Sequence, residues 1–255
     1  MTILDTIVAK KHEEVKATVL PDRQIEGSKR SMSQSLVSGS LPLGVIAEVK
    51  KASPSKGLIA EHFDPEGTAR DYEAAGARAV SVLTDRDFFQ GANQYLTSIR
   101  SQTSLPVLRK DFIIDHLQIE EADLIGADAI LLIAACLTEK ELQEFSLHAR
   151  ERKMESLIEV HDEAELEKVL RACHPDMIGV NNRDLRTFHT DLGVSERLQP
   201  MIPEGTMFIS ESGIHTAADV KRLYEAGADG LLIGESLMKS KDRSAFLENL
   251  FGDLR

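Results

Sequence analysis

Short apolar segments and longer amphipathic segments alternate along this chain from residue 44 onward. The apolar segments are eight in number: VIAEVK (45–50), AVSVLTD (79–85), LPVLRKDF (105–112), AILLIAA (129–135), SLIEVH (156–161), MIGVNN (177–182), MFISES (207–212) and GLLIG (230–234). Near-continuous apolar strands separated by helices are typical of parallel β-sheets that are covered by helices. This alternation limits the possible folds more than any other feature of the sequence.

One helix-stop-strand unit is repeated along the chain, as EAAGARAVSVL, DLIGADAILLI and EAGADGLLIGE. Gly76, Gly126 and Gly227 end the helices, and an alanine and a strand follow each of them. Eight such units in about 210 residues predict an α/β fold, a (βα)8 TIM barrel, with residues 1–255 forming one domain. A doubly wound open sheet is the alternative, but the even strand spacing and the lack of an early glycine-rich fingerprint favour the barrel.

Residues 1–43 lie outside this repeat and form an N-terminal extension. Helical spacing predicts an amphipathic helix over residues 2–19, and a second short helix is expected over 29–38. The positions that carry this spacing are Ile3, Ile7, Val8, His12 and Val15. Periodicity alone does not decide whether the extension caps the bottom of the barrel or forms a lid over its active face.

Composition excludes several classes of partner. The net charge of -12 and the pI near 5.2 disfavour binding to nucleic acid or to an anionic membrane, although a local basic cluster can still bind a small anion. Cys136 and Cys173 suggest no disulfide framework. The N-terminal segment has no continuous apolar core, so we expect neither a signal peptide nor a membrane span. A cytoplasmic protein is therefore expected, and we expect it to be a monomer. Because the chain ends soon after the eighth helical segment, we also expect it to be monofunctional.

Charged residues occur at the ends of the predicted strands, where barrel enzymes place their catalytic groups. Alternation along VIAEVKK puts Glu48 and Lys50 on the face that points into the barrel. Other strands end in a similar way, with Lys110, Glu159, Asn181, Glu211 and Ser212. Each residue alone could form a structural salt bridge, but the recurrence on five of the eight strands favours an active site.

Glycine-containing loops after the last two strands, SGIHT and IGESLM, predict a phosphate site, and SPSKG after the first strand adds hydroxyl and ammonium donors. Phe88, Phe89 and Phe112 either pack the loops or form a wall for an aromatic substrate. The eight histidines show no metal-ligand spacing. We interpret His161, His174 and His189 as structural or surface residues.

The segments IAEVKKASPSKG, FFQG, LRKDFI, GADAILLI, LIEVH, GVNNRDLRTF, SESGI and LLIGESLM closely resemble the indole-3-glycerol phosphate synthase family of tryptophan biosynthesis. The resemblance runs in order from ILDTIVAKK to the end of the chain. It implies a (βα)8 barrel with an N-terminal extension folded over the active face. It also implies ring closure and decarboxylation of 1-(2-carboxyphenylamino)-1-deoxyribulose 5-phosphate to indole-3-glycerol phosphate, CO2 and water, without a cofactor or a metal.

The resemblance also implies roles for the residues at the strand ends. Lys110 would be the general acid that protonates the substrate carbonyl oxygen, and Glu159 the base or electrostatic partner in the later loss of water. Lys50 would hold the substrate carboxylate or donate a proton. The residues that bind and orient hydroxyls and lysines would be Glu48, Asn181 and Glu211, with Ser212 beside them. We expect nearby cations to lower the pKa of the lysine acid toward working pH.

Substrate contacts follow from the same resemblance. The phosphate site would comprise Ser53, Gly213, Gly234 and Glu235, the last two through backbone amides. Arg183 would hold the network, and the anthranilate pocket would be lined by Phe89, Phe112, Leu131 and Leu185. Two positions depart from the family pattern. Glu235 stands where a small residue is expected, so its side chain must turn away from the phosphate, and RSMSQSLVSGSL lacks the expected Phe and Ala of the second extension helix.

Two alternatives to a synthase remain at this point. The first is another phosphosugar barrel enzyme, either phosphoribosylanthranilate isomerase or a Schiff-base aldolase with Lys50 or Lys110 as nucleophile. The second is a barrel that binds a phosphorylated ligand without turnover. Lys50, Lys110 and Glu159 together argue against pure binding, because binding requires neither an acid nor a base.

Overall fold

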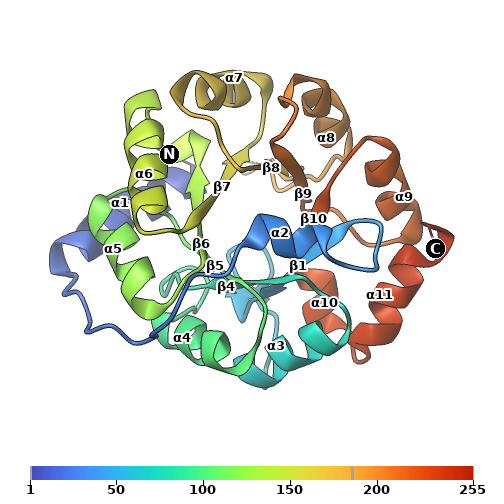
Figure 1. Ribbon diagram of the computed structural model, residues 1–255, viewed down its shortest axis with the longest axis horizontal. Helices are drawn as coiled ribbons and strands as arrows, with labels where there is room; N and C mark the ends of the chain where they lie inside the picture. Colours follow the sequence, from blue (N-terminus) through green and yellow to red (C-terminus); the bar gives the residue numbers. More distant parts are fainter. Residues whose placement is uncertain (1, 185–186, 255) are drawn as a thin grey trace.

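The computed structural model describes residues 2–184 and 187–254. Within these residues eight parallel strands close into a barrel (Figure 1). In order around the barrel they are β1 (Gly44–Val49), β10 (Gly230–Ile233), β9 (Met207–Glu211), β8 (Met177–Asn181), β7 (Glu155–Val160), β6 (Ala129–Ile133), β5 (Val107–Lys110) and β4 (Ala79–Leu83). Each coincides with one predicted run to within two residues at either end. The predicted TIM barrel is confirmed, and the open sheet is not formed.

Helices surround the barrel as the sequence repeat predicted (Figure 1). They are α3 (Pro65–Ala74), α4 (Asn93–Gln102), α5 (His116–Ile125), α6 (Glu139–Glu151), α7 (Glu163–Ala172), α8 (Gly193–Leu198), α9 (Ala217–Glu225), α10 (Glu235–Lys239) and α11 (Arg243–Phe251). Short 3-10 turns lie at η1 (Ala134–Cys136), η2 (Gln199–Met201) and η3 (Gly252–Leu254), and the loop after β1 forms a small antiparallel pair, β2 (Ala52–Ser53) with β3 (Gly57–Leu58).

The strands separate two hydrophobic layers, as alternation along β1 predicted. Val45, Ala47 and Val49 belong to the layer between strands and helices, whereas Ile46 points into the barrel. The interior layer also contains Leu108, Leu131, Leu157, Ile209 and Leu232. Apolar side chains therefore fill the barrel toward the N-terminal ends of the strands. The polar residues lie on top of this layer, at the C-terminal ends of the strands.

The two helices of the N-terminal extension lie at opposite ends of the barrel. Three apolar residues of α1 (Ile3–Ala17) line the cavity at the C-terminal ends of the strands: Ile3, Leu4 and Ile7. In α2 (Met32–Val37), Met32 and Leu36 pack into the interior layer from below, so this helix lies across the near end of the barrel in Figure 1. The expected lid is therefore right for α1 and wrong for α2, because the apolar face of α2 completes the barrel floor.

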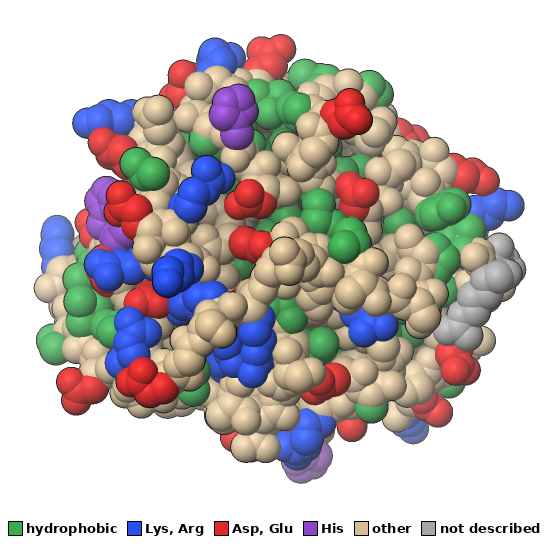
Figure 2. All heavy atoms as spheres, viewed as in Figure 1, with side chains coloured by type: hydrophobic (Ala, Val, Ile, Leu, Met, Phe, Trp, Pro, Cys, Tyr) green, Lys and Arg blue, Asp and Glu red, His purple; other side chains and the backbone are tan. Residues whose placement is uncertain are grey.

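Figure 2 shows the face that α2 covers, and both acidic and basic side chains lie on it. Glu155, at the start of β7, accepts hydrogen bonds from the backbone N–H groups of Met32 and Ser33. It thereby holds the N-terminus of α2 on the barrel. In the described part of the chain, no helix combines the length and the hydropathy needed to cross a membrane.

Candidate active site

A cavity at the C-terminal ends of the strands brings together polar side chains from widely separated parts of the sequence. Among its lining residues are all the predicted catalytic ones: Glu48, Lys50, Lys110, Glu159, Asn181, Glu211 and Ser212. They come from the ends of β1, β5, β7, β8 and β9. Parallel strands in a closed barrel all end at the same rim, which is why residues far apart in sequence become neighbours.

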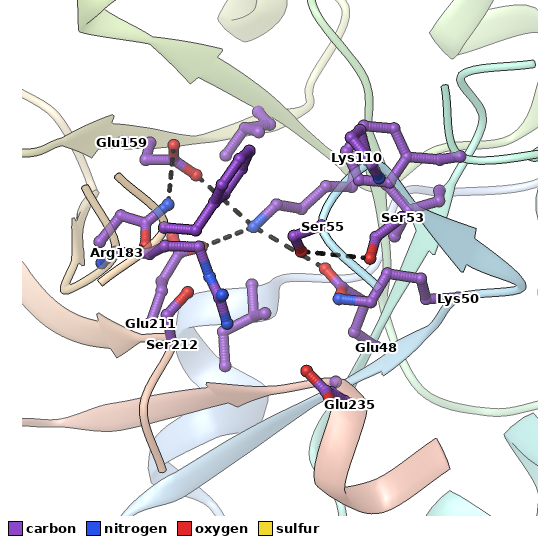
Figure 3. Close-up of a pocket in the computed structure, with 18 of the residues that line it drawn as sticks. Glu48, Lys50, Ser53, Ser55, Lys110, Glu159, Arg183, Glu211, Ser212 and Glu235 are labelled. Atoms are coloured by element: carbon purple, nitrogen blue, oxygen red, sulfur yellow. Dashed lines mark hydrogen bonds and ion pairs between the residues drawn. The ribbon is translucent and has the colours of Figure 1, made fainter. Parts of the chain in front are cut away.

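The ammonium of Lys110 lies at the centre of the cavity, among three carboxylates (Figure 3). Its Nζ donates to Glu211 Oε2 at 2.5 Å, and it lies 3.6 Å from Glu159 Oε2 and 3.8 Å from Glu48 Oε2. Lys110 is the last residue of β5, and only 14% of its side chain is exposed. The three carboxylates thus hold the Lys110 side chain in place, and its ammonium still faces the cavity.

The charged environment raises the pKa of Lys110 above its ordinary value. Burial acts in the opposite direction, but the carboxylates of Glu211, Glu159 and Glu48 outweigh it. The expected lowering by neighbouring cations is therefore wrong, because the groups around this ammonium are anions. Lys110 is charged at neutral pH and can donate a proton or a hydrogen bond to an oxygen atom.

Glu211 is a buried cavity carboxylate whose pKa is raised above its ordinary value. Burial raises its pKa to about 7, and the nearby Glu159 adds to this effect, whereas Lys110 opposes it. Its Oε1 is buried without a hydrogen-bond partner and faces the backbone of Gly179 on β8, where a Cβ atom would collide with it. The absence of a side chain at Gly179 therefore makes room for Glu211 beside Lys110.

Glu48 and Lys50 form the second charged pair of the cavity. Lys50 Nζ donates to Glu48 Oε1 at 2.5 Å, and this lysine lowers the pKa of Glu48 although burial raises it. A Cβ atom at Gly234, just after β10, would crowd both side chains. The absence of a side chain at Gly234 therefore allows the loop after β10 to approach the Glu48–Lys50 pair.

Glu159 lies opposite Lys110 and is held from the neighbouring strand. Asn181 Nδ2 donates to Glu159 Oε1 at 3.2 Å, and the Asn181 side-chain oxygen accepts the backbone N–H of Arg183. Burial tends to raise the pKa of Glu159, but His161, Lys110 and Asn181 lower it to about 2. Glu159 is therefore ionised at neutral pH and available to accept a proton.

An apolar wall closes one side of the cavity. The rings of Phe89 and Phe112 lie with centroids 6.0 Å apart, and Leu131 of β6 lies with them among the cavity-lining residues. Phe88, which the sequence offered for the same wall, is not one of the lining residues in the described chain. Leu185, the fourth predicted pocket residue, lies outside the described residues.

The predicted phosphate residues gather at another part of the rim. Ser53 lies in β2 with its Oγ 3.5 Å from Ser55 Oγ, and Gly213, Gly234 and Glu235 line the same cavity. Ser212 and Gly213 adopt left-handed backbone angles, with φ of 67° and 80°. A serine at positive φ is strained, and such strain is common where a loop is held for function.

Glu235 forms ion pairs at the edge of the cavity. Its Oε1 accepts from Lys239 Nζ at 2.7 Å, one turn further along α10, and lies 3.7 Å from Lys56 Nζ. The ion pair with Lys239 lies within α10, so a side chain of its own helix offsets part of the carboxylate's charge. Figure 3 shows Glu235 separated from the Lys110 cluster.

A protein-family model described as indole-3-glycerol phosphate synthase matches residues 4–250 of the chain. The chain belongs to this family. The family expected from the sequence motifs is thereby confirmed. Relatives in the indole-3-glycerol phosphate synthase family match nearly the whole length of the chain. The synthase of Bacillus velezensis is 52% identical over 252 residues, covering 98% of this chain and 100% of the relative.

Two further members come from other bacteria. The synthase of Desulfotalea psychrophila is 51% identical over 257 residues, and that of Halalkalibacterium halodurans is 49% identical over 250 residues. These matches cover 98% of this chain and 98% and 97% of the relatives. A chain from the tryptophan synthase a2b2 complex of Pyrococcus furiosus shares the fold, with a TM-score of 0.59 and 16% identity over 84% of this chain and 99% of that chain.

Several cavity residues of this family member were not predicted as site residues from its sequence. They include Ile3, Leu4, Ile7, Asp111, Phe188, Ile214, His215 and Ser236. The helical spacing of Ile3 and Ile7 was visible, but it did not say which end of the barrel α1 covers. His161, interpreted as structural, contacts Glu159 directly; it lies two residues after Glu159, a spacing that could have suggested this. Among described residues, no cluster of three His, Cys, Asp or Glu side chains is placed to hold a metal ion.

Proposed function

We propose that the protein catalyses the ring closure and decarboxylation of 1-(2-carboxyphenylamino)-1-deoxyribulose 5-phosphate to indole-3-glycerol phosphate, with release of CO2 and water. Membership of the indole-3-glycerol phosphate synthase family supports this reaction, which is a step of tryptophan biosynthesis. The observation that carries the proposal is the ammonium of Lys110, held among three carboxylates beside an aromatic wall. An acid, a base and an apolar ring site are the groups that this reaction needs.

Three parts of the cavity match three parts of the substrate. The phosphate would lie at Ser53, Gly213, Gly234 and the backbone amide of Glu235, and Lys50 would hold the carboxylate. The ring would pack against Phe89, Phe112, Leu131 and Leu185. Holding both ends of an extended substrate brings the ring carbon toward the ketone, and such positioning removes much of the entropic barrier.

Lys110 would donate its proton to the ketone oxygen as the new carbon–carbon bond forms. Its raised pKa keeps the ammonium charged until the oxygen becomes basic in the transition state. Glu159 would then accept a proton as water leaves. The orienting groups would be Glu48, Asn181 and Glu211, with Arg183 and Ser212 holding the loops that follow Asn181 and Glu211.

The arrangement of charges disfavours the Schiff-base alternative. An amine attacks a carbonyl only when it is deprotonated. The carboxylates around Lys110 favour its protonated form, and Lys50 is paired with Glu48. We therefore expect no covalent adduct when the protein is treated with borohydride in the presence of the substrate.

A turnover assay tests the proposal. Purified protein is mixed with the carboxyphenylamino-deoxyribulose phosphate, and indole absorbance and fluorescence are recorded. We expect an enzyme-dependent signal, together with release of CO2. The absence of a signal at high enzyme concentration would contradict the synthase assignment, and a borohydride-trapped lysine adduct would support an aldolase instead.

The proposal extends to the whole chain as one functional unit, since the extension at residues 1–43 supplies α1 to the cavity. We infer that it acts as a cytoplasmic monomer, without nucleic acid, membrane or cofactor. The acidic net charge of -12 supports the absence of nucleic-acid binding. A monomeric mass in solution and unchanged turnover after metal chelation are the expected results.

A further inference from the structure

His161 links the cavity to the start of α7. It follows β7 directly and lies two residues after Glu159. Its Nε2 lies 3.3 Å from Glu159 Oε1, and its Nδ1 lies 3.1 Å from Glu165 Oε2. The backbone N–H of His161 also donates to Glu165 Oε2 at 2.9 Å. The imidazole is therefore held between a cavity carboxylate and a helix carboxylate, and 15% of its side chain is exposed.

The cavity holds more carboxylates than lysines, and this excess of negative charge makes the contact between His161 and Glu159 important. Three carboxylates, Glu48, Glu159 and Glu211, share two lysines. Lys50 is 2.5 Å from Glu48 and Lys110 is 2.5 Å from Glu211, whereas the Lys110 ammonium is 3.6 Å from Glu159. Like charges at this range favour protonation of one carboxylate. A third cation beside Glu159 therefore favours its ionised form and leaves Glu211 as the carboxylate with the raised pKa.

We propose that His161, as an imidazolium anchored by Glu165, is a positioning residue that keeps Glu159 ionised and turned toward the substrate. The inference rests on the proposed function, because it assigns Glu159 the role of proton acceptor. His161 Nε2 is buried and makes no aligned hydrogen bond, and the carboxylate that it faces is Glu159, with Oε1 at 3.3 Å. Asn181 orients the same oxygen but brings no charge.

The pKa shifts of His161 and Glu159 agree with this geometry, because each residue favours the charged form of the other. Burial lowers the pKa of His161, but the two carboxylates raise it to about 10. Burial raises the pKa of Glu159, and His161 is the first of the groups that lower it to about 2. The other charged and titratable groups that act on this pair are Lys110 on β5, Glu211 on β9, Glu48 on β1, Cys136 in η1 and Glu165 on α7.

The first test compares kcat across pH in the full-length protein. Glu211, with a pKa of about 7, titrates between about pH 8 and about pH 5 in both wild type and variant, so the ratio of variant kcat to wild-type kcat is what reports on Glu159. For His161→Gln, which keeps a polar side chain without the charge, we expect this ratio to fall about tenfold from about pH 8 to about pH 5, as Glu159 gains a pKa of about 6. The exposed His62→Gln is the matched control and should keep the wild-type profile. A ratio of variant to wild-type kcat that stays level across this range, in a folded His161→Gln protein, would overturn the inference.

A second test is independent of turnover. The imidazole carbon-bound proton of His161 is followed by NMR while the pH is raised. We expect His161 to remain charged above about pH 8 in the wild type, and its midpoint to fall in both Glu159→Gln and Glu165→Gln. An unchanged midpoint in Glu159→Gln would contradict the coupling even if the His161 variant failed to fold. If the wild type shows no turnover, the proposed function fails, and this titration still decides whether His161 and Glu159 are coupled.

Discussion

Lys11, on α1, forms a buried ion pair with Asp111, the residue next to Lys110. The two charged atoms are 2.9 Å apart, and only 3% of either side chain is exposed. The same ammonium lies 2.8 Å from Asp85, after β4. Asp85 accepts the backbone N–H groups of Phe88 and Phe89, and Asp111 accepts that of Phe112. One lysine thus ties α1 to both loops of the aromatic wall.

Replacement of Lys11 by Met should lower stability and weaken substrate binding together. It leaves two buried carboxylates short of a partner, and breaking a buried pair costs about 3–5 kcal/mol. The loss of the anchor also frees Phe89 and Phe112, so KM should rise more than kcat falls. Urea unfolding and steady-state kinetics measure both effects. Lys16→Met, at an exposed position on the same helix, should change neither; equal effects from the two variants would contradict the anchoring role.

Replacement of Lys110 by Met should abolish turnover while the substrate still binds. Met fills a similar volume but cannot protonate the ketone oxygen, and a placed general acid contributes about 10²–10⁴-fold. Single-turnover kinetics and a binding titration separate the two effects. Lys140→Met, at a surface position, is the control. Activity within about tenfold of wild type, about 1.4 kcal/mol, would show that Lys110 is not the acid.

Gly179→Ala should reduce kcat although it adds only one methyl group. The new Cβ would collide with Glu211 Oε1 and displace the carboxylate from Lys110. We expect kcat to fall at least about tenfold, with a loss of about 1–3 kcal/mol in the free energy of unfolding from overpacking. Gly252→Ala provides a control, since a Cβ atom at that position would meet no described atom within 4 Å. Full activity in Gly179→Ala would mean that Glu211 has room to move.

Glu211→Gln should change the pH dependence of stability. The folded pKa of Glu211, about 7, lies above its ordinary value of 4.5. Its contribution to stability is therefore present below pH 4.5 and is lost as the pH rises through about 7. Glutamine does not titrate, so the variant should gain free energy of unfolding relative to wild type between about pH 5 and about pH 8. Urea unfolding of both proteins at both pH values measures this gain. A difference in free energy of unfolding between variant and wild type that is the same at both pH values would contradict the raised pKa.

Glu235→Gln should strengthen phosphate binding. The carboxylate lines the cavity where the phosphate would lie, and its pairs with Lys239 and Lys56 cancel only part of its repulsion. Removing the charge also frees Lys56 for the phosphate. We expect a severalfold lower KM at unchanged kcat, with the exposed Glu225→Gln unchanged in both. A higher KM in Glu235→Gln would indicate that the carboxylate organises the loop instead.

The barrel could be predicted because its strands and helices are encoded locally. Apolar runs such as AILLIAA and stop signals such as Gly126 specify where each element begins and ends, and parallel strands with outer helices follow from the pattern. The placement of Glu48 and Lys110 at the rim followed from two-residue alternation alone. The aromatic wall was harder to assign, because Phe88 and Phe89 are neighbours in sequence and only Phe89 is among the described cavity-lining residues.

The parallel barrel, the interior position of the charged residues and the family itself were determined by the sequence, since each depends on spacing along the chain. Only the tertiary structure decided that α1 and α2 cover opposite ends, because long-range contacts with Asp111 and Glu155 place them. It also decided the charge state of Lys110 and the position of His161 beside Glu159. Protonation depends on which charges lie within a few ångströms, and those neighbours come from different strands.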